Sequence, residues 1–196
     1  MHWKYQAGFV VVCVVAPSIA NAQEARILFD GSQSASRGTW VNVNDNVMGG
    51  VSTGRYGFTP EGELSFFGSL SLANNGGFAS VRSRPQQLRL QQDDELWLRV
   101  RGDGRKYNLD LRVPSRRMAF TYRVTMQTAA NQWQEFRVPL KMFQATSFGR
   151  AIANSALVNA ASVNSIGFTI SDKKQGPFRL DVDWVRAVKA GRRLGR

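Results

Sequence analysis

The chain has 196 residues, enough for one domain with a hydrophobic core, and a formal net charge of +12 at pH 7. Its only Cys (Cys13) and its only His (His2) lie near the N-terminus, in a segment that we expect to be removed. The remaining chain therefore cannot form a disulfide, a catalytic triad, a Cys nucleophile, or a zinc, copper or iron site built on His or Cys. What remains is carboxylate, Lys, Tyr or Ser chemistry, or a calcium site built on oxygen ligands.

Residues 1–22 have the pattern of a signal peptide. Lys4 supplies a positive charge, Phe9–Ala16 is apolar, and Ala20–Ala22 has the small-residue pattern of a cleavage site. The apolar run is too short to cross a bilayer as a helix. We therefore expect an exported protein, periplasmic or secreted, with one β-sandwich domain over residues 23–190.

Apolar and polar residues alternate with a period of two along most of the remaining chain, which predicts half-buried strands. In chain order, the predicted strands are 51–58, 63–72, 77–83, 95–101, 107–113, 118–126 and 178–184. Turn signals separate them at Thr59–Gly62, Asn74–Gly77, Gly102–Gly104 and Gln175–Pro177. Many short strands without a long amphipathic helix predict an all-β sandwich or barrel. Residues 139–162 alternate weakly and are expected to form a long surface loop with a short helical turn.

Three tryptophans were placed by this alternation. Trp184 shares a face with Leu180 and Val182, so it is expected in the core. Trp133 is also expected in the core. Trp97 falls on the polar face of its strand, where it would cover the sheet or stack with arginine.

Acidic clusters give little support to catalysis. Asp181 and Asp183 alternate on the polar face of one strand, and Asp93–Glu95 reads as a solvated turn. Arg101–Asp103 spells an integrin-type tripeptide, but it falls at the tip of a hairpin, where Gly-Asp-Gly is favoured for backbone reasons. We therefore expect no enzyme active site.

The stretch VNVNDNVMGGVSTGR (Val41–Arg55) is the main candidate for a site. A phosphate-binding loop would need a following helix and usually a Lys, and neither is present. Two interpretations remain open. In the structural one, Gly49 and Gly50 supply positive φ or a bulge, and the side chains of Asn44, Asp45 and Asn46 cap the turn. Val47 and Met48 would then plug the end of the sandwich.

In the functional interpretation, polar side chains line a site at the rim, beside the flat face of a Trp, a combination that suits a sugar. The candidate ligand-binding residues are Trp40, Asn42, Asn44, Asp45, Asn74, Asn75, Asp172 and Lys173, and the candidate structural loop residues are Met48, Gly49, Gly50, Gly76 and Gly77. No spacing is diagnostic of a metal site, so we assign no metal ligands and no cofactor, with a structural calcium as an open possibility.

Four stretches taken together resemble the complex I intermediate-associated protein 30 family. They are residues 39–55, 66–83, 98–112 and 166–187, in the family's order. The resemblance implies a galactose-binding-like jelly roll, an architecture shared with several carbohydrate-binding modules and one that often carries a structural calcium. Eukaryotic members of the family are mitochondrial factors that help to assemble respiratory complex I. The chain looks like an exported bacterial member, and the resemblance supplies no catalytic residues.

The expected function is non-catalytic: an interaction or assembly-factor-like protein acting at the cell envelope. The alternative is a carbohydrate-binding module that recognises a polysaccharide, and a carboxylate-based enzyme is less favoured. The expected partner is thus a protein or a polysaccharide, and nucleic acid is not expected. A basic tail over residues 191–196 is expected to be disordered and to contact anionic membrane surfaces. The basic residues near the C-terminus are Arg186, Lys189, Arg192, Arg193 and Arg196.

Overall fold

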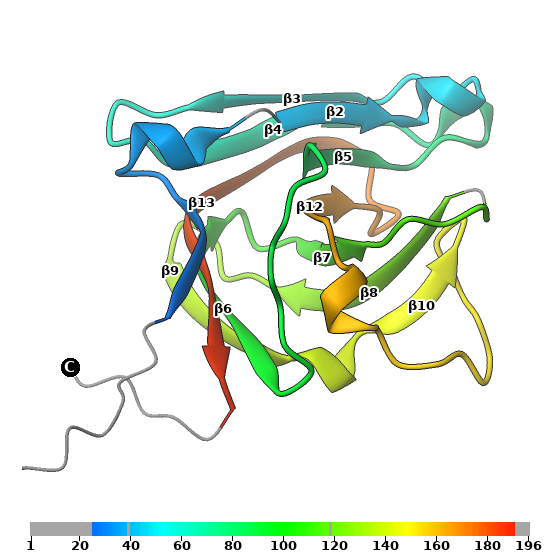
Figure 1. Cartoon of the computed structure of the whole chain (residues 1–196). Coiled ribbons are helices and arrows are strands. Elements are labelled where there is room, and N and C mark those ends of the chain that lie inside the picture. The colour runs from blue at the N-terminus through cyan, green and yellow to red at the C-terminus, as the bar shows by residue number, and fades with distance from the viewer. Residues whose placement is uncertain (1–24, 39, 118, 191–196) are drawn as a thin grey trace, which may run out of the picture.

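The computed structural model of the protein describes residues 25–38, 40–117 and 119–190, which form two antiparallel β-sheets packed face to face (Figure 1). Sheet A has the strand order β3-β4-β13-β6-β9, with β1 also paired to β13. Its strands are β1 (Arg26–Asp30), β3 (Thr53–Phe58), β4 (Leu64–Leu70), β6 (Asp94–Gly102), β9 (Trp133–Pro139) and β13 (Gly176–Lys189). The fold is therefore the all-β jelly-roll sandwich of galactose-binding-like type that the alternation and the resemblance predicted.

Sheet B has the strand order β11-β10-β8-β7-β12-β5-β2. Its strands are β2 (Trp40–Asn44), β5 (Ala79–Ser83), β7 (Lys106–Arg112), β8 (Phe120–Gln127), β10 (Gln144–Ser147), β11 (Arg150–Ala151) and β12 (Ser165–Ile170). Five short 3-10 turns connect strands in the described residues: η1 (Ser34–Arg37), η2 (Asp45–Met48), η3 (Ala73–Asn75), η4 (Leu140–Met142) and η5 (Ala160–Ser162). No helix in this described part is long and apolar enough to cross a membrane.

The core lies between the two sheets and is built from the apolar positions of the alternating strands. In β7, Tyr107, Leu109 and Leu111 are fully buried, and in β12 Ile166 and Phe168 are buried opposite them. Residues on the other face of each strand point outward, so each sheet has an outer face of polar side chains. This confirms the alternation over most predicted strands.

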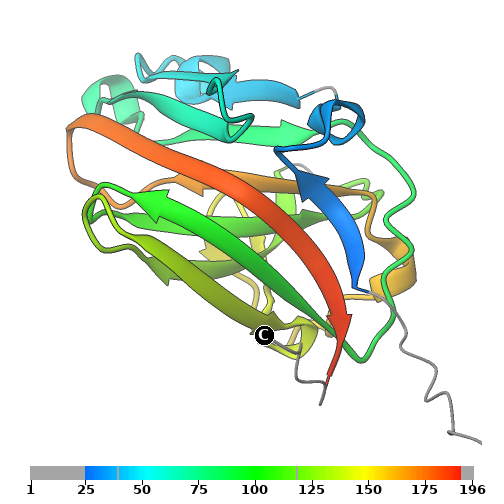
Figure 2. The same cartoon turned by 90° about the vertical axis from the view of Figure 1, so that its left-hand side faces the viewer.

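A β-bulge makes the prediction for Trp184 wrong. Val182 pairs with Val100 of β6, but Trp184 already pairs with Arg99, so Asp183 is an extra residue in β13. One extra residue exchanges the two faces of a strand, and Trp184 therefore points outward. Figure 2 shows how far β13 runs across sheet A, with β1 and β6 beside its second half. Trp133 was also wrongly expected in the core.

Residues 139–162 contain more regular structure than predicted. β10 pairs with β8, and β11 folds back on β10, so this segment extends sheet B at its edge. Both strands are too short to show alternation in the sequence, which explains the wrong prediction of a loop. The proposed signal peptide (1–22) and basic tail (191–196) lie outside the described residues.

Candidate functional site

Asp45 holds together the loops at one end of the sandwich. The residue is 0% exposed, and its carboxylate accepts hydrogen bonds from Ser52 N at 2.9 Å, Ser52 Oγ at 2.5 Å and Gly77 N at 2.7 Å. Phe78 N donates a fourth at 3.3 Å. Burial alone would raise the pKa of Asp45, but these hydrogen bonds outweigh it and lower the pKa. The carboxylate is therefore ionised, and it accepts its hydrogen bonds from groups of the protein itself.

Two glycines let the chain approach this carboxylate. A Cβ at Gly50 would lie 2.3 Å from Asp45 Cγ, and one at Gly76 would lie 2.6 Å from Asp45 Oδ2. Gly49 adopts a left-handed conformation with φ of 89°, as does Gly77 with φ of 126°. The geometry of Gly49–Gly50 thus matches the structural interpretation of the opening stretch, except that Gly50 is needed for space rather than for positive φ.

The remaining residues predicted at this rim do not converge on a pocket. Trp40 is only 5% exposed and packs edge-on against Phe29 at 5.6 Å between ring centroids, so its face is not offered to a ligand. The amide of Asn44 donates to Gly54 O at 3.0 Å. Asn42, Asn74 and Asn75 are exposed, as are Val47 and Met48, which were expected to plug the sandwich. Asn74 and Asn75 have φ of 55° and 57°, values that suit a turn.

Asp172 joins two turns through Arg105. Arg105 Nε donates to one carboxylate oxygen at 3.0 Å and Nη2 donates to the other at 2.6 Å. Burial works against this charge, but the hydrogen bonds from Arg105 and Lys174 N lower the pKa of Asp172. Lys173 is exposed with φ of 61°. Both carboxylate oxygens of Asp172 therefore accept hydrogen bonds from the protein itself. The neighbouring Lys173 side chain lies at the surface.

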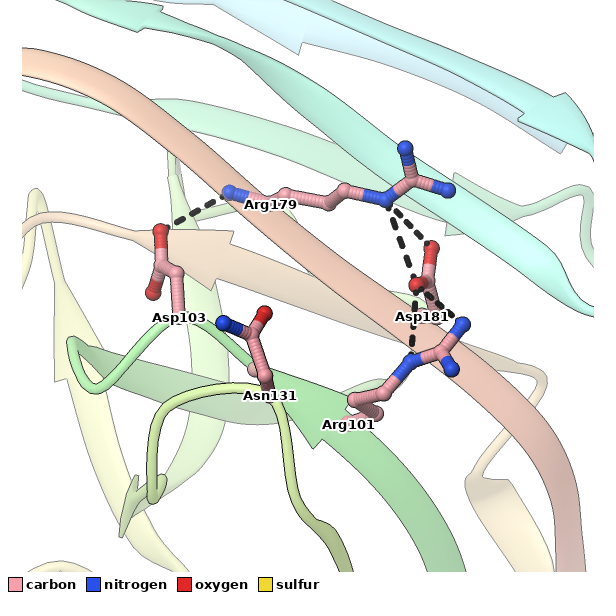
Figure 3. Close-up of a pocket in the computed structure, with 6 residues that line it drawn as sticks. Arg101, Asp103, Asn131, Arg179 and Asp181 are labelled. Atoms are coloured by element: carbon pink, nitrogen blue, oxygen red, sulfur yellow. Dashed lines mark hydrogen bonds and ion pairs between the residues drawn. The ribbon is translucent and has the colours of Figure 1, made fainter.

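A hollow of about 370 Å³ lies on the outer face of sheet A, and Figure 3 shows the residues that line it. Asp181 accepts hydrogen bonds from Arg101 Nη2 at 3.0 Å and Arg179 Nε at 3.0 Å. Asp103 lies at the tip of the β6–β7 hairpin and accepts a hydrogen bond from Arg179 N at 2.9 Å. Its carboxylate therefore binds the backbone of β13. Two arginines face two aspartates in this hollow, and their charges balance.

The three tryptophans on the same face lie beneath arginines. Arg99 and Arg101 stand over Trp133 at 4.5 and 4.8 Å from the ring centroid. Arg137 stands over Trp97 at 4.0 Å and Arg186 over Trp184 at 4.5 Å. The expected stacking of Trp97 is confirmed. Arg186, counted above with the basic C-terminal residues, belongs to β13, as does Lys189, which pairs with Asp93 at 3.3 Å.

The outer face of sheet B is hollowed and polar. Several of its outward side chains are nearly inaccessible: Ser80, Asn108, Asp110, Thr121, Thr146, Ser165 and Thr169. A second hollow, of about 270 Å³, lies where β8, β10 and β11 meet, and Arg123, Thr125, Met142 and Thr146 are among its lining residues. This face also carries Arg82 and Arg112, which the sequence reasoning missed. Each occupies a polar position of an alternating strand, but only the strand order reveals that they are neighbours.

Among the described residues, no three Asp, Glu, His or Cys side chains gather in a group that suits a metal ion.

Several curated proteins are similar to this chain along most of its length. The mouse protein named complex I intermediate-associated protein 30, mitochondrial, is 27% identical over 183 residues, which cover 83% of this chain and 56% of that protein. Its Drosophila melanogaster namesake is 24% identical over 184 residues, covering 83% and 62%. The chain thus spans little more than half the length of these relatives.

Solved structures with a similar fold include a family 11 carbohydrate-binding module of a cellulosomal cellulase from Clostridium thermocellum. It has a TM-score of 0.63 and 11% identity, covering 85% of this chain and 95% of the module. An agarase has a TM-score of 0.57 and 14% identity, covering 88% of this chain but 25% of the enzyme. At these identities the likeness shows the fold alone.

The comparisons overturn the expectation of export. The relatives from mouse, Caenorhabditis briggsae and Drosophila are named as mitochondrial proteins, not exported ones. The prediction was wrong because a basic residue, a short apolar run and small residues are a weak pattern, and other N-terminal segments also combine these residue types.

The family model described as complex I intermediate-associated protein 30 matches residues 27–182. The match begins in β1 and ends in β13, so it includes strands of both sheets and the loops joined by Asp45. It covers well over half of the chain, and it agrees with the four stretches that carried the resemblance. The chain therefore belongs to the complex I intermediate-associated protein 30 family.

Proposed function

We propose that this chain is a non-catalytic binding protein with an assembly-factor-like role, which holds a protein partner during the assembly of respiratory complex I. The observation that carries the proposal is the family match over residues 27–182, together with the names of the curated relatives. Because the chain spans little more than half of those relatives, their role is taken here as a proposal for the shared sandwich.

The state of the buried carboxylates supports a non-catalytic role. At least one arginine forms an ion pair with each of Asp110, Asp172 and Asp181, so these carboxylates already have partners within the protein. A glycosidase instead needs two carboxyl groups facing a substrate, one of them with a raised pKa. Burial does raise the pKa of Glu63, but its acidic neighbour Asp181 is bound by arginines.

The carbohydrate-binding alternative rests on fold similarity. A sugar platform needs an open aromatic face, whereas Trp97, Trp133 and Trp184 are stacked under arginines. Trp40 is buried. This arrangement favours a protein partner over a sugar.

The test is an affinity capture with the tagged full chain, incubated with detergent-solubilised membranes of the cells that produce it. Mass spectrometry would quantify bound proteins against a tag-only control and against competition by excess untagged chain. We expect competable enrichment of complex I subunits or of their assembly intermediates. Failure to enrich them in repeated captures would overturn the proposal, and saturable binding on a glycan array by the same preparation would support the alternative.

A further inference from the structure

A row of residues from four strands crosses the outer face of sheet B and brings together charged side chains from three of them. The strand registers pair Gly167 of β12 with Arg82 of β5 on one side and with Asp110 of β7 on the other, and Asp110 in turn with Arg123 of β8. Arg112 lies two residues beyond Asp110 in β7 and so shares its face. Three arginines therefore share this face with one aspartate.

The carboxylate of Asp110 is already used by one of these arginines. Arg123 donates to its two oxygens at 2.7 and 2.8 Å, and Thr169 Oγ1 donates at 2.7 Å. Within the described residues, Arg82 and Arg112 make no side-chain hydrogen bond or ion pair. Two arginines on this face of the described structure therefore have no ion-pair partner of their own.

Arg112 is half-buried. Its Nε is buried and has no hydrogen-bond partner. Burial, and then the positive charge of Arg82, lowers the pKa of Arg112, although the negative charge of Asp110 works in the opposite direction. A buried donor without a partner is costly, so an anion that reached this Nε would remove that cost.

Gly167 leaves the sheet bare between the two unpaired arginines. A Cβ there would lie 2.7 Å from Val81 O and 2.9 Å from Arg82 Cβ, so the strands fit only around glycine. Arg82 flanks Gly167 on one side, and Arg112 lies two residues along β7 from Asp110, which flanks it on the other. The backbones of β5 and β7 are roughly 10 Å apart, so both arginine side chains are long enough to reach the space over Gly167. That opening suits one planar anion bound by two guanidinium groups.

A mostly polar hollow adjoins the charged row. Arg123 lines the hollow of about 270 Å³ together with polar residues such as Gln144 and Thr146, and Met142 lies at its side. Met142 is 56% exposed, although it is a large apolar side chain. A site that combines arginines, hydrogen-bonding side chains and one exposed apolar side chain matches a peptide segment better than it matches a free inorganic anion.

We propose that the outer face of sheet B binds an acidic segment of a protein partner, with a carboxylate over Gly167 between Arg82 and Arg112 and an apolar side chain against Met142. The proposal deepens the proposed function and rests on it for the class of partner.

The test uses fluorescence anisotropy with a labelled peptide of alternating Glu and Leu, and a copy with Gln in place of Glu. The Arg82→Gln/Arg112→Gln chain is compared with wild type and with Arg116→Gln/Arg117→Gln, a control with the same charge change on exposed arginines. We expect the Glu peptide to bind wild type saturably and its Kd to rise about tenfold or more in the first variant. We expect a change of less than about twofold in the control. The Arg82→Gln single variant repeats the test if the double variant unfolds.

Equal weakening in both double variants would overturn the proposal, because the binding would then follow net charge alone. Equal binding of the Gln peptide would overturn it as well, and so would displacement of the Glu peptide by inorganic phosphate but not by acetate. The affinity capture separates this failure from that of the proposed function. If the site variant still recovers complex I subunits, the site is refuted and the function stands. If wild type recovers none but binds the Glu peptide as expected, the function fails and the acidic-segment site remains.

Discussion

Replacing Asp45 with Ala should destabilise the sandwich strongly, because it removes the acceptor shared by two loops. Four donors, Ser52 N, Ser52 Oγ, Gly77 N and Phe78 N, would lose their partner in a place that is 0% exposed at Asp45. Hydrogen bonds to a charged group are each worth about 1.5–3 kcal/mol, and buried donors left without partners add to the cost.

The four contributions do not simply add, since the loops can relax and admit water. We therefore expect a loss of about 3–5 kcal/mol in the free energy of unfolding, the range typical of breaking a buried charged network. In a chain of this length, that loss corresponds to a fall in Tm on the order of 10 °C. The measurement is urea denaturation and calorimetry of the full chain. Asp93→Ala is the matched control, since Asp93 is 51% exposed and its surface pair with Lys189 is worth less than about 1 kcal/mol.

The pH dependence gives a second readout of the same carboxylate. The folded-state pKa of Asp45 is lowered, so its stabilisation is fully present above the unfolded value of about 3.9 and is lost as pH falls through the lower folded value. The difference in unfolding free energy between wild type and Asp45→Asn should thus be largest near neutral pH and shrink toward about pH 3. Unchanged stability of Asp45→Ala, or parallel curves for wild type and Asp45→Asn, would refute the structural role and return the loop to the ligand-binding interpretation.

Two further substitutions test the turns. Gly62→Ala should cost about 3 kcal/mol in a urea melt, because φ is +97° and the new Cβ would lie 1.9 Å from the backbone oxygen of Gly31, whereas Gly57→Ala has open space and should be nearly neutral. Arg105→Lys should lower the unfolding free energy by about 1–3 kcal/mol, because an ammonium group cannot reproduce the bidentate contact with Asp172. A Lys variant as stable as wild type would show that the charge alone is sufficient.

Much of the fold was predictable because alternation is a local property of each strand. The positions of Tyr107, Leu109 and Leu111 in the core follow from a period of two, and the structure agrees. The burial of Asp45 was not predictable in the same way. A run of Asn and Asp beside glycines is typical of an exposed loop, and only the approach of Gly77 from a distant segment explains why this carboxylate is enclosed.

The error at Trp184 has a different physical origin. The alternation in β13 is correct up to Val182 and then reverses at the bulge, which no residue pattern around Asp183 announces. The bulge places Trp184 on the outer face, where Arg186 covers its ring. A single extra residue thus decides whether a tryptophan contributes to the core or to the surface chemistry of sheet A.

The two outer faces also show why a net charge of +12 could not by itself indicate a site. On sheet A, Arg101 and Arg179 both donate hydrogen bonds to Asp181, so these two arginines already have a partner within the protein. On sheet B, Asp110 forms its ion pair with Arg123, and Arg82 and Arg112 have no ion-pair partner of their own. Net charge is a sum over both faces, whereas binding depends on the charge left over at one place. The arginines that the fold leaves unpaired are therefore better candidates for a partner site than the larger number that it has already neutralised.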